Sequence, residues 1–135
     1  MRITPMNPDA APSPGGHYSH TVRIDLDGGA LLFVSGQVAL DRNGDLVGEG
    51  DMARQAEQVF DNLRTALEAN GASFGDVVKV TTFVTDMSEL QTVRDVRKRY
   101  LADPPPASTT VEVSGLFRPE VLIEVEAVAA IDGGS

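Results

Sequence analysis

Residues 121–131 read VLIEVEAVAAI, and this stretch decides the fold. Its alternate positions Ile123, Val125, Ala127 and Ala129 are all apolar, which predicts a β-strand with one fully buried face. The other face carries Glu124 and Glu126 between Leu122 and Val128. A strand this apolar cannot present a wet face, so the sheet that contains it needs cover on both sides.

The other predicted strands precede this segment in the chain. β-Branched or alternating apolar residues indicate strands at 21–26, 30–35, 77–85 and 109–113, and a short one at 46–47. Turn residues at 27–29 and 41–44 separate the early strands. Residues 1–17 are rich in proline and glycine, which disfavours helix and central strand and predicts an ordered or semi-ordered arm.

Two helices are predicted between the strands. The first shows one apolar stripe, with Asp51 placed as its N-cap and Gly71 where it stops; the stripe is formed by Ala56, Val59, Phe60, Leu63, Ala66 and Leu67. The second follows Asp86 or Ser88 and ends before the three prolines at 104–106. Its apolar face consists of Leu90, Val93, Val96 and Tyr100.

This element order predicts one α+β domain over residues 1–135. Helices that connect strands imply crossovers, so we expect a mixed sheet with both helices on one face. Two helices cannot cover both sides of the sheet. Association of the open face with sister subunits is the economical solution.

Composition and charge restrict the partners. The 135 residues include 20 acidic and 11 basic side chains, a formal net charge of -9, which opposes binding to nucleic acid. There is no cysteine, so disulfides, thiolate nucleophiles and cysteine-based zinc sites are impossible. With only two histidines, His17 and His20, we expect no metal site. Neither a signal peptide nor an apolar run long enough for a membrane is present, which makes the cytoplasm the expected location.

Three places in the sequence could carry chemistry. Glu124 and Glu126 either pair with basic residues at a subunit interface, or one of them is a general acid or base. The glycine of Ser35-Gly36-Gln37 allows a ligand to approach the backbone and offers an N–H to an anion; alternatively, it marks a bulge that ends the strand. Tyr18 is a further candidate, although a lone tyrosine is more often a packing residue.

Several segments together resemble the reactive intermediate deaminase (RidA/YjgF) family, also described as L-PSP endoribonuclease-like. In chain order they are APSPGGHYS at 11–19, FVSGQ at 33–37, QAEQVFDNL at 55–63, NGASFGDVVKVT at 70–81, FVTDM at 83–87 and EVEAVA at 124–129. The resemblance implies a chorismate-mutase-like fold and a homotrimer with clefts between subunits. It also implies hydrolysis of enamines and imines to a carbonyl compound and ammonia, without a cofactor.

The resemblance also implies roles for individual residues. Glu124 matches the glutamate that positions water, Gly36 the glycine of the substrate-binding turn with Ser35 and Gln37, and Tyr18 the pocket tyrosine. Ser108 stands where the family has an arginine that grips the substrate carboxylate, and serine cannot form that two-pronged contact. Arg94 or Arg118 could bring a positive charge into the cleft instead, or lie on the surface.

We therefore expect a cytoplasmic homotrimer that hydrolyses a small imine or enamine. Glu124 acts on water in this hypothesis, and Gly36 and Ser108 hold the substrate. Without an arginine at 108, short 2-imino acids should be poor substrates. The alternative is a non-catalytic trimer that binds a small metabolite in the same cleft. Ribonuclease or translation-inhibitor activity is disfavoured by the net charge and by the lack of a histidine-based acid–base pair.

Overall fold

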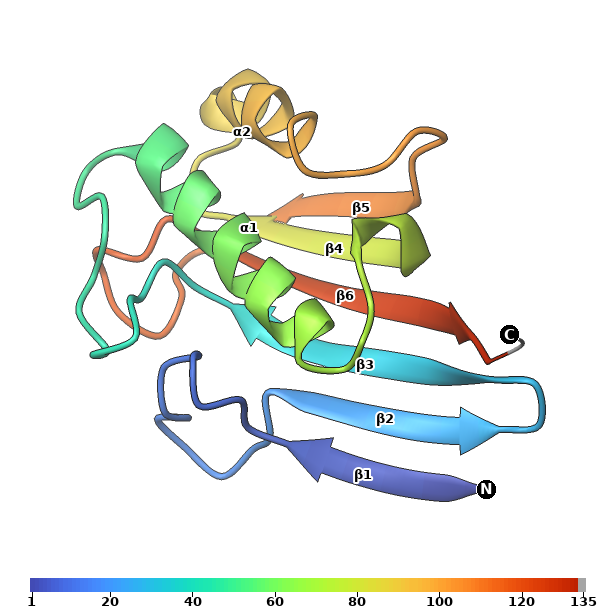
Figure 1. Ribbon diagram of the computed structural model, residues 1–135. Coiled ribbons are helices and arrows are strands. Elements are labelled where there is room, and N and C mark those ends of the chain that lie inside the picture. Colours follow the sequence, from blue (N-terminus) through green and yellow to red (C-terminus); the bar gives the residue numbers. More distant parts are fainter. Residues whose placement is uncertain (134–135) are drawn as a thin grey trace.

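A computed structural model describes residues 1–133 as one six-stranded sheet with two α-helices on one face (Figure 1). The strands are β1 (Arg2–Met6), β2 (Thr21–Leu26), β3 (Gly29–Gln37), β4 (Val77–Val84), β5 (Ala107–Glu112) and β6 (Ile123–Asp132). The helices are α1 (Met52–Glu68) and α2 (Leu90–Arg97), with short 3-10 turns η1 (Phe74–Asp76) and η2 (Met87–Glu89). No helix in this described part is long and apolar enough to cross a bilayer.

The last strand lies inside the sheet. The order of strands in the sheet is β1-β2-β3-β6-β4-β5. In it, β6 pairs antiparallel with both β3 and β4, while β4 and β5 are parallel. The mixed sheet and the single helical layer confirm the predicted α+β class. Ile123, Val125 and Ala129 of β6 are fully buried beneath the helices, as their alternation predicted.

Helix α1 forms for the reasons that its sequence indicates. The Asp51 side chain accepts a hydrogen bond from the Arg54 N–H (3.1 Å) and so caps the helix. The predicted apolar stripe is buried against β3 and β6, with Phe60 and Leu63 fully inaccessible. Gly71, just beyond the helix, has a φ of +73°, a conformation that favours glycine.

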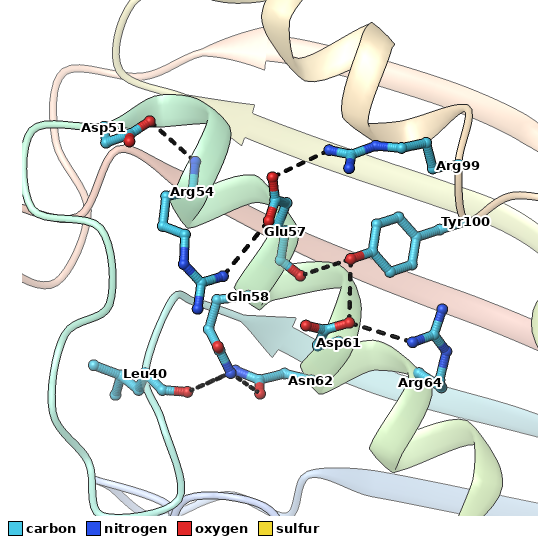
Figure 2. Close-up of polar contacts among 10 residues, drawn as sticks. All are labelled: Leu40, Asp51, Arg54, Glu57, Gln58, Asp61, Asn62, Arg64, Arg99 and Tyr100. Atoms are coloured by element: carbon cyan, nitrogen blue, oxygen red, sulfur yellow. Dashed lines mark hydrogen bonds and ion pairs between the residues drawn. The ribbon is translucent and has the colours of Figure 1, made fainter.

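Polar and aromatic contacts join the segment after α2 to α1 (Figure 2). The Tyr100 hydroxyl donates to Asp61 Oδ1 (3.1 Å), and its ring stacks on Phe60 at 5.3 Å between centroids. Arg99 forms an exposed ion pair with Glu57 (3.2 Å). Exposed ion pairs contribute little, so the ring stacking and the buried apolar contacts stabilise this packing most.

One prediction about local structure was wrong, and one segment contains a strand that was not predicted. Leu46 and Val47 form no strand, because Leu46 makes only an isolated bridge to Leu40 while the chain turns toward α1. The N-terminal arm, in turn, contains β1, which pairs with β2 at the edge of the sheet. Pro5 is tolerated there because an edge strand has backbone groups that need no partner.

The sheet face opposite the helices is also apolar. Val22 and Ile24 of β2 lie opposite Phe33 and Leu31 of β3, on the face that no described helix covers. Phe33 remains 43% exposed. The covered face holds the alternate residues of β3, such as the buried Leu32. One chain thus leaves apolar surface exposed on the face that also carries Glu124.

Candidate functional site

A pocket of about 760 Å³ opens where β3 and the start of β6 meet three loops. The wall residues that the loops contribute are Pro12, Ser13, Gly15, Gly16 and Tyr18 from the first, Val38, Leu40 and Gly44 from the second, and Phe117 and Arg118 from the third. The pocket brings together most of the candidates chosen from the sequence, namely Tyr18, Ser35, Gly36, Gln37, Arg118 and Glu124. Residues more than 100 positions apart, such as Tyr18 and Glu124, therefore line one pocket.

A β-bulge shapes the floor of the pocket. Val34 pairs with Ala127 and Gln37 with Val125, so Ser35 and Gly36 together lie opposite the single residue Glu126. The Ser35 hydroxyl donates to the Ser19 carbonyl (2.6 Å), and its N–H donates to the His20 carbonyl (2.8 Å). The bulge expected for the Ser-Gly-Gln segment is confirmed, and the segment also lines the pocket.

The Glu124 carboxylate lies directly against Gly36. A methyl group added at Gly36 would overlap that carboxylate, so no other residue fits without displacing it. Among residues 1–133, no basic side chain forms an ion pair with Glu124. Its half-burial raises the pKa of the carboxyl group above the ordinary value, and the nearby negative charge of Glu126 raises it further.

His20 connects the loop over the pocket to its floor. Its Nε2 lies 2.6 Å from the Pro12 carbonyl oxygen, and its Nδ1 lies 3.1 Å from Gln37 Nε2. Because a carbonyl oxygen only accepts, the ring carries its hydrogen on Nε2, and Nδ1 accepts from the Gln37 amide. The Tyr18 ring packs edge-on against this buried histidine at 5.9 Å and is itself 48% exposed.

Arg118 supplies positive charge to the pocket. Its guanidinium carbon lies 4.9 Å from the centre of the Phe117 ring, and its buried Nε has no hydrogen-bond partner in the described chain. The following segment is fastened by Gln55 of α1, which donates to the Glu120 carbonyl (2.9 Å) and accepts from the Leu122 N–H (2.9 Å). A fully buried helix residue thus fixes the end of the loop that carries Arg118.

One chain does not bring Ser108 or Arg94 to this pocket. Ser108 pairs with the buried Val80 on the helix-facing side of the sheet, and its hydroxyl accepts a hydrogen bond from Arg97 Nη1 (3.4 Å). Arg94 is exposed on α2. Of the two candidate arginines, Arg118 is therefore the one that lines the pocket.

Phe117 and His20 are two residues of the pocket wall that were not among the candidates chosen from the sequence. Phe117 is 59% exposed, and a large aromatic residue beside a candidate arginine in a loop was the available signal. His20 was considered only as a possible metal ligand, whereas it organises the loop over the pocket. Within residues 1–133 no group of three or more histidine or acidic side chains is arranged to hold a metal ion.

Comparison with known proteins relates the chain to a family over nearly its whole length. Residues 8–131 match the sequence model of the family described as Endoribonuclease L-PSP. Protein DfrA of Myxococcus xanthus is 40% identical over 121 residues, covering 90% of each chain. A 2-iminobutanoate/2-iminopropanoate deaminase of Dermatophagoides farinae is 32% identical over 122 residues, covering 90% of this chain and 91% of the relative.

A solved structure shows the same fold. The crystal structure of RidA from the Antarctic bacterium Psychrobacter sp. PAMC 21119 superposes with a TM-score of 0.86 at 32% identity. It covers 95% of this chain and 99% of its own. The chorismate-mutase-like fold implied by the resemblance is thereby confirmed.

Proposed function

We propose that this protein hydrolyses an imine or enamine to a carbonyl compound and ammonia. The proposal starts from the family, because the chain belongs to the Endoribonuclease L-PSP family, which includes RidA proteins. The observation that carries the proposal is the position of Glu124. Its carboxylate is half-buried, has no basic partner in the described chain and lies against Gly36 in the pocket. Such a group can hold and deprotonate a water molecule.

The chemistry requires little beyond a positioned water. A water O–H donates to the Glu124 carboxylate while the water oxygen adds to the carbon of a protonated imine. The carboxylate takes the proton, and the resulting carbinolamine carries one hydroxyl and one amino group. Glu124 returns the proton to that nitrogen, the C–N bond breaks, and the nitrogen leaves as ammonia while the carbonyl forms. The hydroxyl proton released in this step completes the ammonium ion.

The pocket wall supports this reaction in two ways. Gly36 lets the Glu124 carboxylate lie against the backbone at the edge of the pocket, because any side chain at this position would fill the space that the carboxylate occupies. Tyr18, half exposed at the pocket, offers a ring against which a planar imine can pack. No cofactor takes part in any step.

We further propose that the protein works as a homotrimer. The apolar face formed by β2, β3 and β6 contains partly exposed residues such as Phe33, and burial of such a face against sister subunits stabilises an assembly. Glu124 lies on this face, so neighbouring subunits would enclose the pocket and exclude bulk water from it.

Substitution of Glu124 tests the proposed reaction. Imines are generated in situ by an amino-acid oxidase, and their disappearance is followed by semicarbazide trapping and ammonia release. Glu124→Gln should reduce turnover by at least about 100-fold, in line with the loss of a general base, while fold and particle mass stay unchanged. The control Glu68→Gln removes an exposed carboxylate at the end of α1 and should leave turnover unaffected. Wild-type protein with no turnover on any imine would favour the non-catalytic binding function instead.

The family description also names ribonuclease activity, but the pocket offers little support for it. Both ring nitrogens of His20, the histidine in the wall, already have partners within the chain. The net charge of -9 also opposes the approach of a phosphate backbone. Hydrolysis of a small nitrogen compound fits these features better.

A further inference from the structure

His20 joins three segments of the chain beside the pocket. The loop between β1 and β2, to which it belongs, lies next to the end of β3 (Figure 1). Its backbone N–H donates to Asn7 Oδ1 (2.8 Å), and its carbonyl accepts from the Ser35 N–H (2.8 Å). Its two ring nitrogens contact the Pro12 carbonyl and the Gln37 amide. With only 5% of its surface exposed, this histidine is fixed both to the loop and to the bulge of β3.

The ring can make its two contacts in one protonation state only. Nδ1 has to accept, because both hydrogens of Gln37 Nε2 point to acceptors, one to Nδ1 (3.1 Å) and the other to the Ser35 carbonyl (3.1 Å). A protonated imidazole donates from both nitrogens, so its Nδ1–H would face a Gln37 N–H. Two opposed donors repel each other, and the amide then has to turn and leave the Ser35 carbonyl. The hydrogen bonds from His20 through Gln37 to Ser35 are called the latch below.

The latch holds the part of β3 that seats the Glu124 carboxylate. The hydroxyl and the N–H of Ser35 are bonded to backbone carbonyls of the loop, and Gln37 holds its remaining backbone group. The next residue, Gly36, is the one against which the carboxylate lies. Movement of the bulge therefore shifts the surface on which the carboxylate rests, and a group positioned for catalysis tolerates little movement.

A positive charge on the His20 ring has no counter-charge bonded to it. Within residues 1–133 no acidic side chain forms an ion pair with this histidine. The charged or titratable side chains that line the pocket with it are Tyr18, Arg118 and Glu124. The arginine and the glutamate bring opposite charges to the same wall, and Asp9 and His17 in the loop itself are exposed. Because a buried charge without a partner is costly, a protonated ring is stable only when the contacts around it open.

We propose that His20 is a positioning residue with a pH-dependent effect: its neutral ring keeps the latch closed and Glu124 in place, and protonation of the ring opens the latch and switches the site off. The latch itself stands on the hydrogen bonds, whereas its effect on turnover rests on the proposed hydrolysis. Imidazole is the side chain that ordinarily changes charge between about pH 5 and 8. Acidification is therefore the signal to which the switch responds.

Replacement of the ring by an amide separates the latch from its pH response. A glutamine side chain can donate to the Pro12 carbonyl and accept from Gln37, but it does not titrate. At about pH 8, His20→Gln should keep kcat within about threefold of the wild type, because the latch stays closed. His20→Leu makes neither contact and should lower kcat at least about tenfold, with less effect on KM. The matched control is His17→Gln, the same change at the exposed histidine of this loop, which should behave like the wild type.

The pH profile of kcat/KM decides whether the ring acts as a switch. Protonation of Glu124 also ends its action on water, so one titrating group belongs to the acidic limb of every variant that keeps this residue. With His20 as a second group, the limb of the wild type and of His17→Gln should be steeper, approaching about two protons, and that of His20→Gln should correspond to about one. Equal steepness in the wild type and His20→Gln would overturn the switch. Full activity of a folded His20→Leu protein at about pH 8 would overturn the latch.

Nuclear magnetic resonance on the native assembly tests the latch without turnover and without a variant. At about pH 8 the His20 ring should be the neutral Nε2–H tautomer, and on acidification the signals of the Gln37 side-chain amide and the Ser35 N–H should change together with those of the ring. An Nδ1–H tautomer, or a ring that gains its proton while both other signals stay constant, would overturn the proposal. If the signals change together but no imine is hydrolysed, the proposed function fails and the latch stands. If the wild type and His20→Gln hydrolyse imines with the same pH profile, the switch fails and the proposed function stands.

Discussion

The Glu124 carboxylate rests directly on the backbone of Gly36, and no side chain separates them. The contact joins the bulge in β3 to the second residue of β6. It makes the position of the carboxylate depend on the absence of a single methyl group. The contact can therefore be tested by the smallest possible substitution.

Gly36→Ala should displace the Glu124 carboxylate and reduce turnover at least about tenfold, because positioned groups tolerate little movement. The free energy of unfolding should change little, because the atoms that must move belong to the end of the flexible Glu124 side chain. Steady-state kinetics and urea unfolding measure the two effects. In the control Gly75→Ala, the added methyl group meets only Ser73 Oγ at 3.4 Å, an ordinary contact. Full activity of Gly36→Ala would mean that the contact has no role in positioning.

The stability of the protein should depend on pH through Glu124. Because folding raises the pKa of this carboxyl group above 4.5, its contribution to stability is fully present below pH 4.5 and is lost as pH rises through the raised pKa. Glu124→Gln removes this dependence, so the variant should gain stability relative to the wild type between acidic and neutral pH. Urea unfolding at fixed protein concentration across that range measures the difference. A constant difference between the two proteins would contradict the raised pKa.

Removal of the neighbouring charge should shift the pH dependence of activity. Glu126 is exposed, and its negative charge raises the pKa of Glu124. In Glu126→Gln the pKa of Glu124 falls, so the acidic limb of the kcat/KM profile should move to lower pH. The pH–rate profile of both proteins checks this direction. A limb that stays in place would show that a group other than Glu124 controls it.

Gln55→Leu should destabilise the fold and loosen the loop that carries Arg118. The fully buried amide donates to the Gly48 and Glu120 carbonyls and accepts from the Leu122 N–H. Leucine leaves these backbone groups without partners, which should cost about 2–4 kcal/mol. Urea unfolding measures the loss, and Gln91→Leu at an exposed position of α2 is the control. A loss no greater than that of the control would contradict the role of Gln55.

The uncovered sheet face should control assembly. A charge placed in it, as in Phe33→Asp, should dissociate the proposed trimer, because a desolvated carboxylate without a partner is costly. Analytical ultracentrifugation should give a wild-type particle of three chains and a smaller particle for the variant. Lys98→Asp, on the helical layer, should keep the wild-type mass. A wild-type monomer would contradict the trimer.

Local pattern was enough to predict most of the fold. The alternation in 121–131 predicted the buried strand β6, and the periodicity after Asp51 predicted α1 with its cap. These features depend on side chains two to four positions apart, so the order of residues alone is enough to predict them. The strand expected at 46–47 was wrong, and β1 was not foreseen as a strand, because short segments acquire their structure from the partners they meet.

The sequence by itself determined that Glu124 would lie on one face of a buried strand, opposite a row of apolar side chains. It could not determine which positive side chain would line the same pocket as that carboxylate. Arg94 and Arg118 were equal candidates along the chain, and only the tertiary structure brings Arg118 into the pocket. The reason is that a loop side chain is placed by contacts far away in sequence, here the hydrogen bonds from Gln55 across 65 residues.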